Sequence, residues 1–108
     1  MREVERSRFV PMTPRELERL LDPSLIVEFE GSFSVQSTVE AEAGTLVTAS
    51  GPGLTFTLRF EPLDRGFYYT QAGEAGPFES METWLTFEPE NEGSRVSIRS
   101  AVSIGVPV

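Results

Sequence analysis

Much of this chain alternates between apolar and polar side chains with a period of two residues. The clearest run is LTFTLRFE, residues 54–61, in which every second residue is Leu or Phe. Successive side chains of a β-strand point to opposite faces, so this run predicts a strand with one apolar face. Five more strands are predicted between short turns that contain Gly or Pro, at residues 31–40, 45–50, 67–73, 79–90 and 94–100. Strands joined by such short turns are antiparallel neighbours, which predicts a six-stranded meander.

The first thirty residues add one strand and two short helices. Residues 2–10 are predicted to be a strand. In the segment TPRELERLL that follows, Thr13 is suited to the helix N-cap, Pro14 to the first helical position and Glu16 to a capping box. PSLIVEF, residues 23–29, predicts a second short helix. The first strand buries its apolar side by joining the meander, so we expect a single α+β domain with a seven-stranded antiparallel sheet.

The charge of the chain argues against several classes of partner. Asp and Glu number 17, Arg numbers 9 and Lys is absent, which gives a net charge of −8. Such a surface repels phosphate backbones and anionic lipids, so we expect no nucleic-acid partner. An acidic surface without Lys is typical of cytoplasm at very high salt, and a coding bias that replaces Lys by Arg would produce the same composition.

The residues that are missing from the sequence narrow the chemistry further. Without Cys, the chain can form no disulfide and no thiolate zinc site. Without His, it lacks the commonest general base and metal ligand. We therefore expect no metal and no cofactor. No apolar run approaches the roughly 20 residues that span a bilayer, so we expect a cytoplasmic protein with no membrane span.

The order of these elements resembles the START-like, helix-grip superfamily (SRPBCC), which includes polyketide cyclases and coenzyme Q-binding proteins. SRFVPMTPRELERLLDPSLIVEF resembles its opening, where a strand leads into a Pro-capped helix and a second short helix. TWLTFEPENEGSRVSIRS resembles its closing hairpin around an acidic Gly turn. The resemblance implies that the seven-stranded sheet curves, with the two short helices between strands one and two. It also implies an elongated apolar cavity between the sheet and a long C-terminal helix.

The family's long helix would follow Val108, and the sequence ends there. We therefore expect residues 1–108 to be one START-like domain that is incomplete at its C-terminus. The face that the helix would cover carries Val96, Ile98, Val102 and Ile104. We expect this face to be exposed or to be buried against a second copy in a homodimer, because large exposed apolar patches usually mark an interface.

The inner face of the sheet carries most of the predicted ligand-binding residues. The alternation places six of them there: Phe33, Val35, Phe56, Leu58, Tyr69 and Ile98. From the residues alone, these side chains form either a packed core or the lining of a pocket for a flat or long apolar ligand. The resemblance favours the pocket, because helix-grip cavities are lined by such alternating positions.

Glu82 and Trp84 complete the predicted site. Residues 79–90 are apolar on both faces around Trp84, which predicts either a bulge or contacts on two sides. If Trp84 points inward then so does Glu82, whose carboxyl pKa would rise in an apolar pocket. The alternative is a solvated Glu82. An inward Arg8 near Glu82 would provide a polar anchor, and the alternative for Arg8 is a surface ion pair.

Three functions are compatible with these residues. The leading one is binding of a hydrophobic small molecule (a lipid, a quinone or a polyketide-like compound) without catalysis. The second is an enzyme of the polyketide cyclase or hydratase type. Its acid–base candidates are Glu82, Tyr69 and Arg8, but none has a clear partner, so we assign no catalytic residue. The third is a protein-interaction module with a stress-related role, as is known among relatives of this fold.

Overall fold

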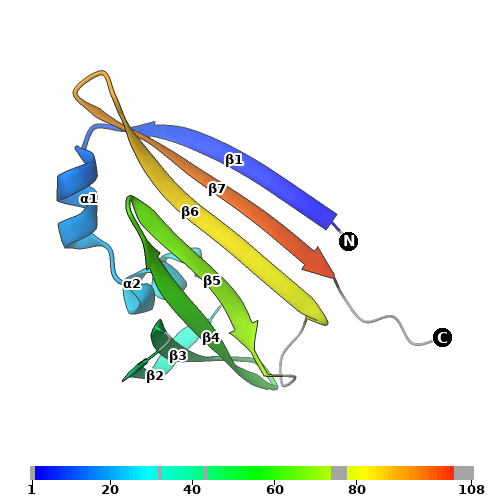
Figure 1. Ribbon diagram of the computed structural model, residues 1–108. Coiled ribbons are helices and arrows are strands. Elements are labelled where there is room, and N and C mark those ends of the chain that lie inside the picture. Colours follow the sequence, from blue (N-terminus) through cyan, green and yellow to red (C-terminus); the bar gives the residue numbers. More distant parts are fainter. Residues whose placement is uncertain (1, 32, 43, 74–77, 104–108) are drawn as a thin grey trace.

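The computed structural model describes residues 2–31, 33–42, 44–73 and 78–103 (Figure 1). These residues form a seven-stranded antiparallel sheet in the order β1-β7-β6-β5-β4-β3-β2, with two helices between the first two strands. The strands are β1 (Arg2–Val10), β2 (Ser34–Ala41), β3 (Gly44–Gly51), β4 (Leu54–Leu63), β5 (Gly66–Ala72), β6 (Ser80–Glu90) and β7 (Gly93–Ser103). The helices are α1 (Pro14–Leu20) and α2 (Pro23–Glu30). The predicted α+β class, strand number and helix positions are confirmed.

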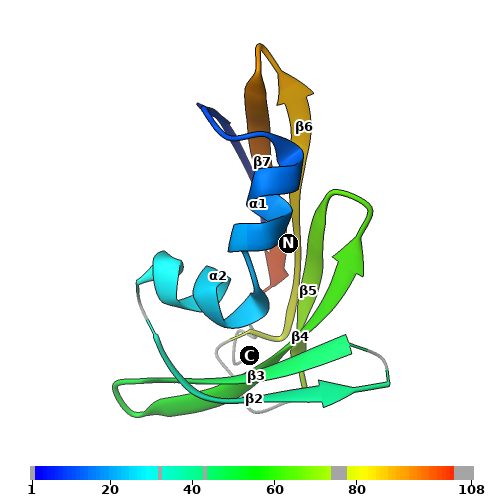
Figure 2. The same ribbon diagram turned by 90° about the vertical axis from the view of Figure 1, so that its left-hand side faces the viewer.

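The sheet is strongly bent, and both helices lie inside the bend. Figure 2 shows β6 and β7 upright and β2 and β3 running across below them, with α1 and α2 on the concave side between them. Each pair of neighbouring strands is antiparallel, and β1 joins the sheet through β7. None of the helices in the described residues has the length and apolarity that a bilayer crossing requires.

Local signals in the sequence fix where the two helices begin. The Thr13 hydroxyl accepts a hydrogen bond from the Glu16 amide, and the Glu16 carboxylate accepts one from the Thr13 amide at 3.2 Å. This is the predicted capping box. The second helix is capped by Asp22, which accepts a hydrogen bond of 2.8 Å from the Leu25 amide. It ends at Gly31, whose φ of 87° lies in the left-handed region that glycine adopts at little cost.

Strand β2 contains a bulge, so the alternation seen in residues 31–40 does not place one set of residues on the same face throughout. The β2–β3 register shifts just after Val35, which lies opposite the buried Ala49. Beyond the bulge Thr38 lies opposite the buried Val47, so the odd-numbered residues change faces. Val39 therefore points away from the core and is 54% exposed.

The buried core lies where α2 packs against the concave face of β3 and β4. Its members come from these three elements: Val27, Val47, Ala49, Phe56, Leu58 and Phe60. Burying each of the larger side chains contributes about 1.5–3 kcal/mol. Phe60 stacks on Tyr69 of β5, with ring centroids 4.4 Å apart. The core therefore sets the distance between α2 and the sheet. This distance determines the size of the cavity that lies between them.

Candidate ligand-binding site

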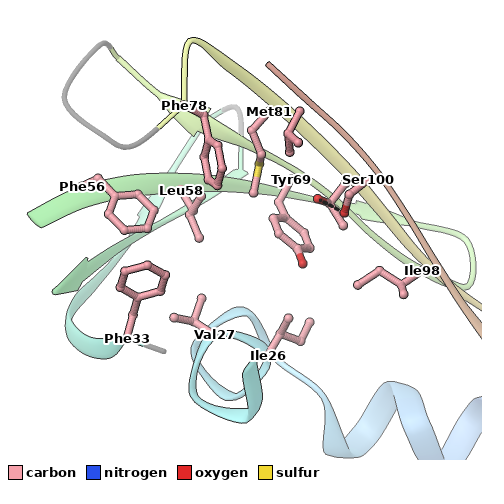
Figure 3. A pocket seen from close by; sticks show the side chains of 12 residues that line it. Ile26, Val27, Phe33, Phe56, Leu58, Tyr69, Phe78, Met81, Ile98 and Ser100 are labelled. Atoms are coloured by element: carbon pink, nitrogen blue, oxygen red, sulfur yellow. Dashed lines mark hydrogen bonds between the residues drawn. The ribbon is translucent and has the colours of Figure 1, made fainter. Parts of the chain in front are cut away.

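A cavity of about 240 Å³ lies between α2 and the concave face of the sheet (Figure 3). Its lining comes from α2, β4, β5, β6 and β7, together with two residues outside these elements: Ile26, Val27, Phe33, Phe56, Leu58, Tyr69, Phe78, Met81, Thr83, Ile98, Ser100 and Val102. An enclosed cavity of about 150 Å³ holds benzene, and drug-sized ligands occupy about 300–1,000 Å³. The cavity therefore has room for a molecule of one or two rings.

One end of the cavity is aromatic. Phe33 and Phe56 meet edge to face, with ring centroids 4.9 Å apart and planes at 81°. Phe78 and Leu58 also line the cavity and are labelled in Figure 3. Gln71 of β5 fixes the Phe78 backbone, because its side-chain amide donates a 2.8 Å hydrogen bond to the Phe78 carbonyl and accepts a 3.3 Å one from the Phe78 amide. The aromatic wall is therefore held by both packing and hydrogen bonds.

The other end of the cavity carries hydroxyl groups. Tyr69, Thr83 and Ser100 are opposite one another on β5, β6 and β7, so their side chains share the concave face. The hydroxyls of Thr83 and Ser100 are hydrogen-bonded at 2.8 Å, and Thr83 is only 1% exposed. Figure 3 shows this bond as a dashed line beside Ser100. Ile98 lies farther from Phe33 and Phe56 than this bond does in the same view. The cavity thus has an aromatic end and a hydroxyl end.

Most of the predicted site residues meet at this cavity. Five of the eight line it directly: Phe33, Phe56, Leu58, Tyr69 and Ile98. Val35 packs against the core cluster and is not part of the lining. The face predicted for the last strand carries Val96, Ile98, Val102 and Ile104. Ile98 and Val102 line the cavity, and Val96 lies two residues before Ile98 on β7 and so points to the same face. Ile104 lies outside the described residues.

The inward placement of Glu82 and Trp84 is wrong, because both lie on the convex face. The β6–β7 register is continuous from Ser80 to Glu90, so there is no bulge in this pair. The Trp84 ring lies between Tyr68, at 5.2 Å between ring centroids, and the Arg99 guanidinium carbon, at 4.3 Å from the ring centroid. This cation–π contact provides the Trp84 ring with a packing partner on the convex face, outside the buried core. Strand β6 is therefore apolar on both faces because it makes contacts on both.

The predicted contact between Arg8 and Glu82 is also wrong. Arg8 lies opposite Val96 on β7, whereas Glu82 lies opposite Ala101. Arg8 has the parity of Val96 and Ile98, which places it on the concave side, and its side chain is exposed. Glu82 is on the convex side, so the two charged groups are separated by the sheet itself.

Glu82 instead contacts Tyr68 on the convex face. The Tyr68 hydroxyl donates a 2.7 Å hydrogen bond to the Glu82 carboxylate. This bond raises the pKa of Tyr68 above its ordinary value of 10.0, helped by partial burial and by the charges of Glu82 and Glu61, while the Arg59 charge opposes the shift. Because the pKa is raised in the folded state, the resulting stability is present below pH 10.0 and is lost as the pH rises through the raised pKa.

Glu82→Gln is therefore expected to lower the pKa of Tyr68 towards its ordinary value, because the charged acceptor is removed. The pKa is measured by following the Tyr68 ring signals in nuclear magnetic resonance spectra as the pH rises. Glu61→Gln is the control and is expected to lower the pKa less, because Glu61 acts on Tyr68 through its charge alone. An equal or larger effect of the Glu61 variant would contradict this geometry.

Six lining residues are absent from the sequence-based prediction: Ile26, Val27, Phe78, Met81, Thr83 and Ser100. The two from α2 depend on how the helix packs on the sheet, which no local pattern gives. Ser100 lies between Ile98 and Val102 in the predicted alternation of the last strand, so that pattern also places it on their face. Met81 and Thr83 follow once Trp84 is placed on the convex face.

In the described ranges, no cluster of three or more His, Cys, Asp or Glu side chains is arranged to hold a metal ion.

Comparisons of the sequence with known proteins find no relative. No family model matches the sequence. No curated protein matches it either.

Several solved structures share this architecture. The protein TTHA0849 from Thermus thermophilus superimposes with a TM-score of 0.76 at 22% identity, over 99% of this chain and 77% of that one. A protein from Thermobifida fusca gives 0.73 at 17% identity, over 97% of this chain and 76% of that one. Ara h 8.0201 gives 0.69 at 16% identity, over 99% of this chain and 81% of that one. The TM-scores show that this chain shares the fold of these proteins, and at identities this low the likeness shows the fold alone.

Proposed function

We propose that this protein binds a hydrophobic small molecule of the lipid, quinone or polyketide-like kind in the concave cavity, without catalysing a reaction on it. The observation that carries the proposal is the lining itself, which is apolar or aromatic apart from Thr83, Ser100 and the hydroxyl of Tyr69. Each Å² of apolar surface that a ligand removes from water here contributes about 25 cal/mol. The helix-grip fold of the compared structures supports the same conclusion, as an analogy between folds.

The placement of the acid–base candidates supports binding over catalysis. Glu82 and Arg8 lie outside the cavity lining, which leaves Tyr69. A general acid or base needs a reacting group within hydrogen-bond reach and a pKa matched to its task. Two of the three acid–base candidates are therefore outside the lining that a bound molecule would contact.

Naphthalene is a suitable probe, because it has two rings and no polar atom. Wild-type protein is expected to show saturable shifts of the Ile26, Val27 and Ile98 methyl signals when naphthalene is added. Ile98→Trp is expected to weaken binding at least about tenfold, because the indole occupies the ligand's space and an overlap of about 1.4 kcal/mol or more has that effect.

The matched control is Ser97→Trp, which adds the same indole to the same strand on the convex face. Ser97 lies opposite Thr86 and Ser7, away from the cavity. Its naphthalene affinity is expected to equal that of the wild type, with thermal unfolding confirming that both variants fold. Unchanged binding in the Ile98 variant, or no binding by the wild type, would contradict the proposed function.

A further inference from the structure

We propose that the ligand is an uncharged ring compound bearing a hydroxyl or carbonyl oxygen, and that Thr83 and Ser100 select it by hydrogen bonding to that oxygen. This inference rests on the proposed function, since it names the class of ligand for the same cavity. It follows from three properties of the cavity: the chemistry of the hydroxyl pair, the separation of its two ends, and the charge of its lining.

The hydroxyl pair retains hydrogen-bonding capacity. Two hydroxyls together have two hydrogens and four lone pairs, and the 2.8 Å bond between Thr83 and Ser100 uses one of each. One O–H and three lone pairs remain available to a third group. A ligand hydroxyl can accept from and donate to the pair, and a carbonyl can accept from it. A hydrocarbon would cover the pair without forming either bond, which costs the free energy of an unmade hydrogen bond.

The position of the pair makes this capacity unusual. A second cross-strand hydroxyl pair, Thr48 and Thr57, joins β3 and β4 at 3.2 Å. These two residues alternate with the inward-facing Val47 and Phe56, so they lie on the convex face. The pair formed by Thr83 and Ser100 lies in the wall of a cavity whose other lining residues, apart from the Tyr69 hydroxyl, are apolar. A ligand that covers this pair displaces water from it, and a ligand oxygen replaces the hydrogen bonds that water would make.

The two ends of the cavity fix the orientation of the ligand. Phe33 and Phe56 present an aromatic corner at one end, and Ser100 lies towards the opposite end (Figure 3). A ring compound that packs in the aromatic corner directs a substituent on its far side towards the hydroxyl pair. The described lining carries no charged side chain, so a carboxylate or ammonium at the hydroxyl pair would lose its hydration without gaining a counter-ion. The oxygen is therefore that of a neutral group.

The test compares β-naphthol with naphthalene, which has the same rings without the oxygen. In the double variant Thr83→Val/Ser100→Ala, both hydroxyls are replaced by apolar groups, so neither is left unpaired and the fold is retained. The affinity for β-naphthol is expected to fall about three- to tenfold, the value of one net hydrogen bond, while the affinity for naphthalene stays equal or rises. Calorimetric or resonance titrations give both constants.

The control is Thr48→Val/Thr57→Val, which removes a hydroxyl pair from the convex face and is expected to leave both affinities unchanged. If the double variant at the cavity binds both compounds as the wild type does, the hydroxyl pair does not select the ligand, although the proposed function stands. If β-naphthoate binds as tightly as β-naphthol, the uncharged class is wrong. If naphthalene and β-naphthol both fail to bind the wild type, the proposed function itself fails.

Discussion

Replacing Gly66 by alanine is expected to destabilise the protein by about 4 kcal/mol, or to unfold it. Gly66 begins β5 with φ of 147°, in a region where residues with side chains are strained by about 1–3 kcal/mol. A Cβ at this position would overlap with the Leu85 carbonyl oxygen and lie 2.9 Å from the Thr86 Cα. Both atoms are backbone of the adjacent strand β6, so relief requires the β5–β6 ladder to open, at about 1–3 kcal/mol more.

The comparison for this variant is Gly53→Ala, measured by urea unfolding under the same conditions. Gly53 also has a positive φ, of 69°, but nothing lies within 4 Å of an added Cβ. Its replacement is expected to cost only the left-handed strain of about 1–2 kcal/mol. Equal losses in the two variants would show that the contact with β6 is not as described.

Phe60→Ala is expected to cost about 3–5 kcal/mol, a large part of the roughly 5–15 kcal/mol that stabilises a typical domain. Phe60 is 1% exposed and lies in the core beneath α2. Its ring stacks on Tyr69 at 4.4 Å and meets Phe67 edge to face at 6.3 Å. The truncation leaves a void that these neighbours fill only in part, so the loss exceeds the transfer free energy of the ring alone.

Phe29→Ala is the matched truncation on the surface. Phe29 lies on α2 and is 69% exposed, so its removal is expected to change the free energy of unfolding by less than about 0.5 kcal/mol. Urea unfolding of both variants provides the comparison. A cost for Phe60→Ala below about 2 kcal/mol would mean that the α2–sheet core is not the main source of stability.

The fold was predictable because its signals are local. The alternation in residues 54–61 identifies a strand with one buried face, and β4 buries Phe56, Leu58 and Phe60 on that face. Short Gly-containing turns make neighbours antiparallel, and the observed register follows chain order from β2 to β7. Thr13 and Glu16 set the start of α1 by a hydrogen-bonded cap between residues three apart.

The candidate site was less predictable because it depends on contacts between distant residues. The bulge after Val35 reverses the facing of the rest of β2, and nothing in an alternating pattern reports a shift in register. Trp84 lies on the convex face, where its partner is Arg99 of the next strand, 15 positions later in the sequence. The hydroxyls of Thr83 and Ser100 come together only when β6 and β7 pair, although they are 17 residues apart in sequence.

The most direct test of this account is to locate a bound neutral ring compound. Nuclear Overhauser effects between β-naphthol and protein methyl groups report protons a few ångströms apart. The geometry of the cavity requires such effects at Val27, Leu58 and Ile98, which surround it, and none at Val39, whose side chain is exposed on the convex face. Contacts at Val39 without any at Ile98 would mean that the ligand binds the convex surface and that the cavity beside α2 is not the site.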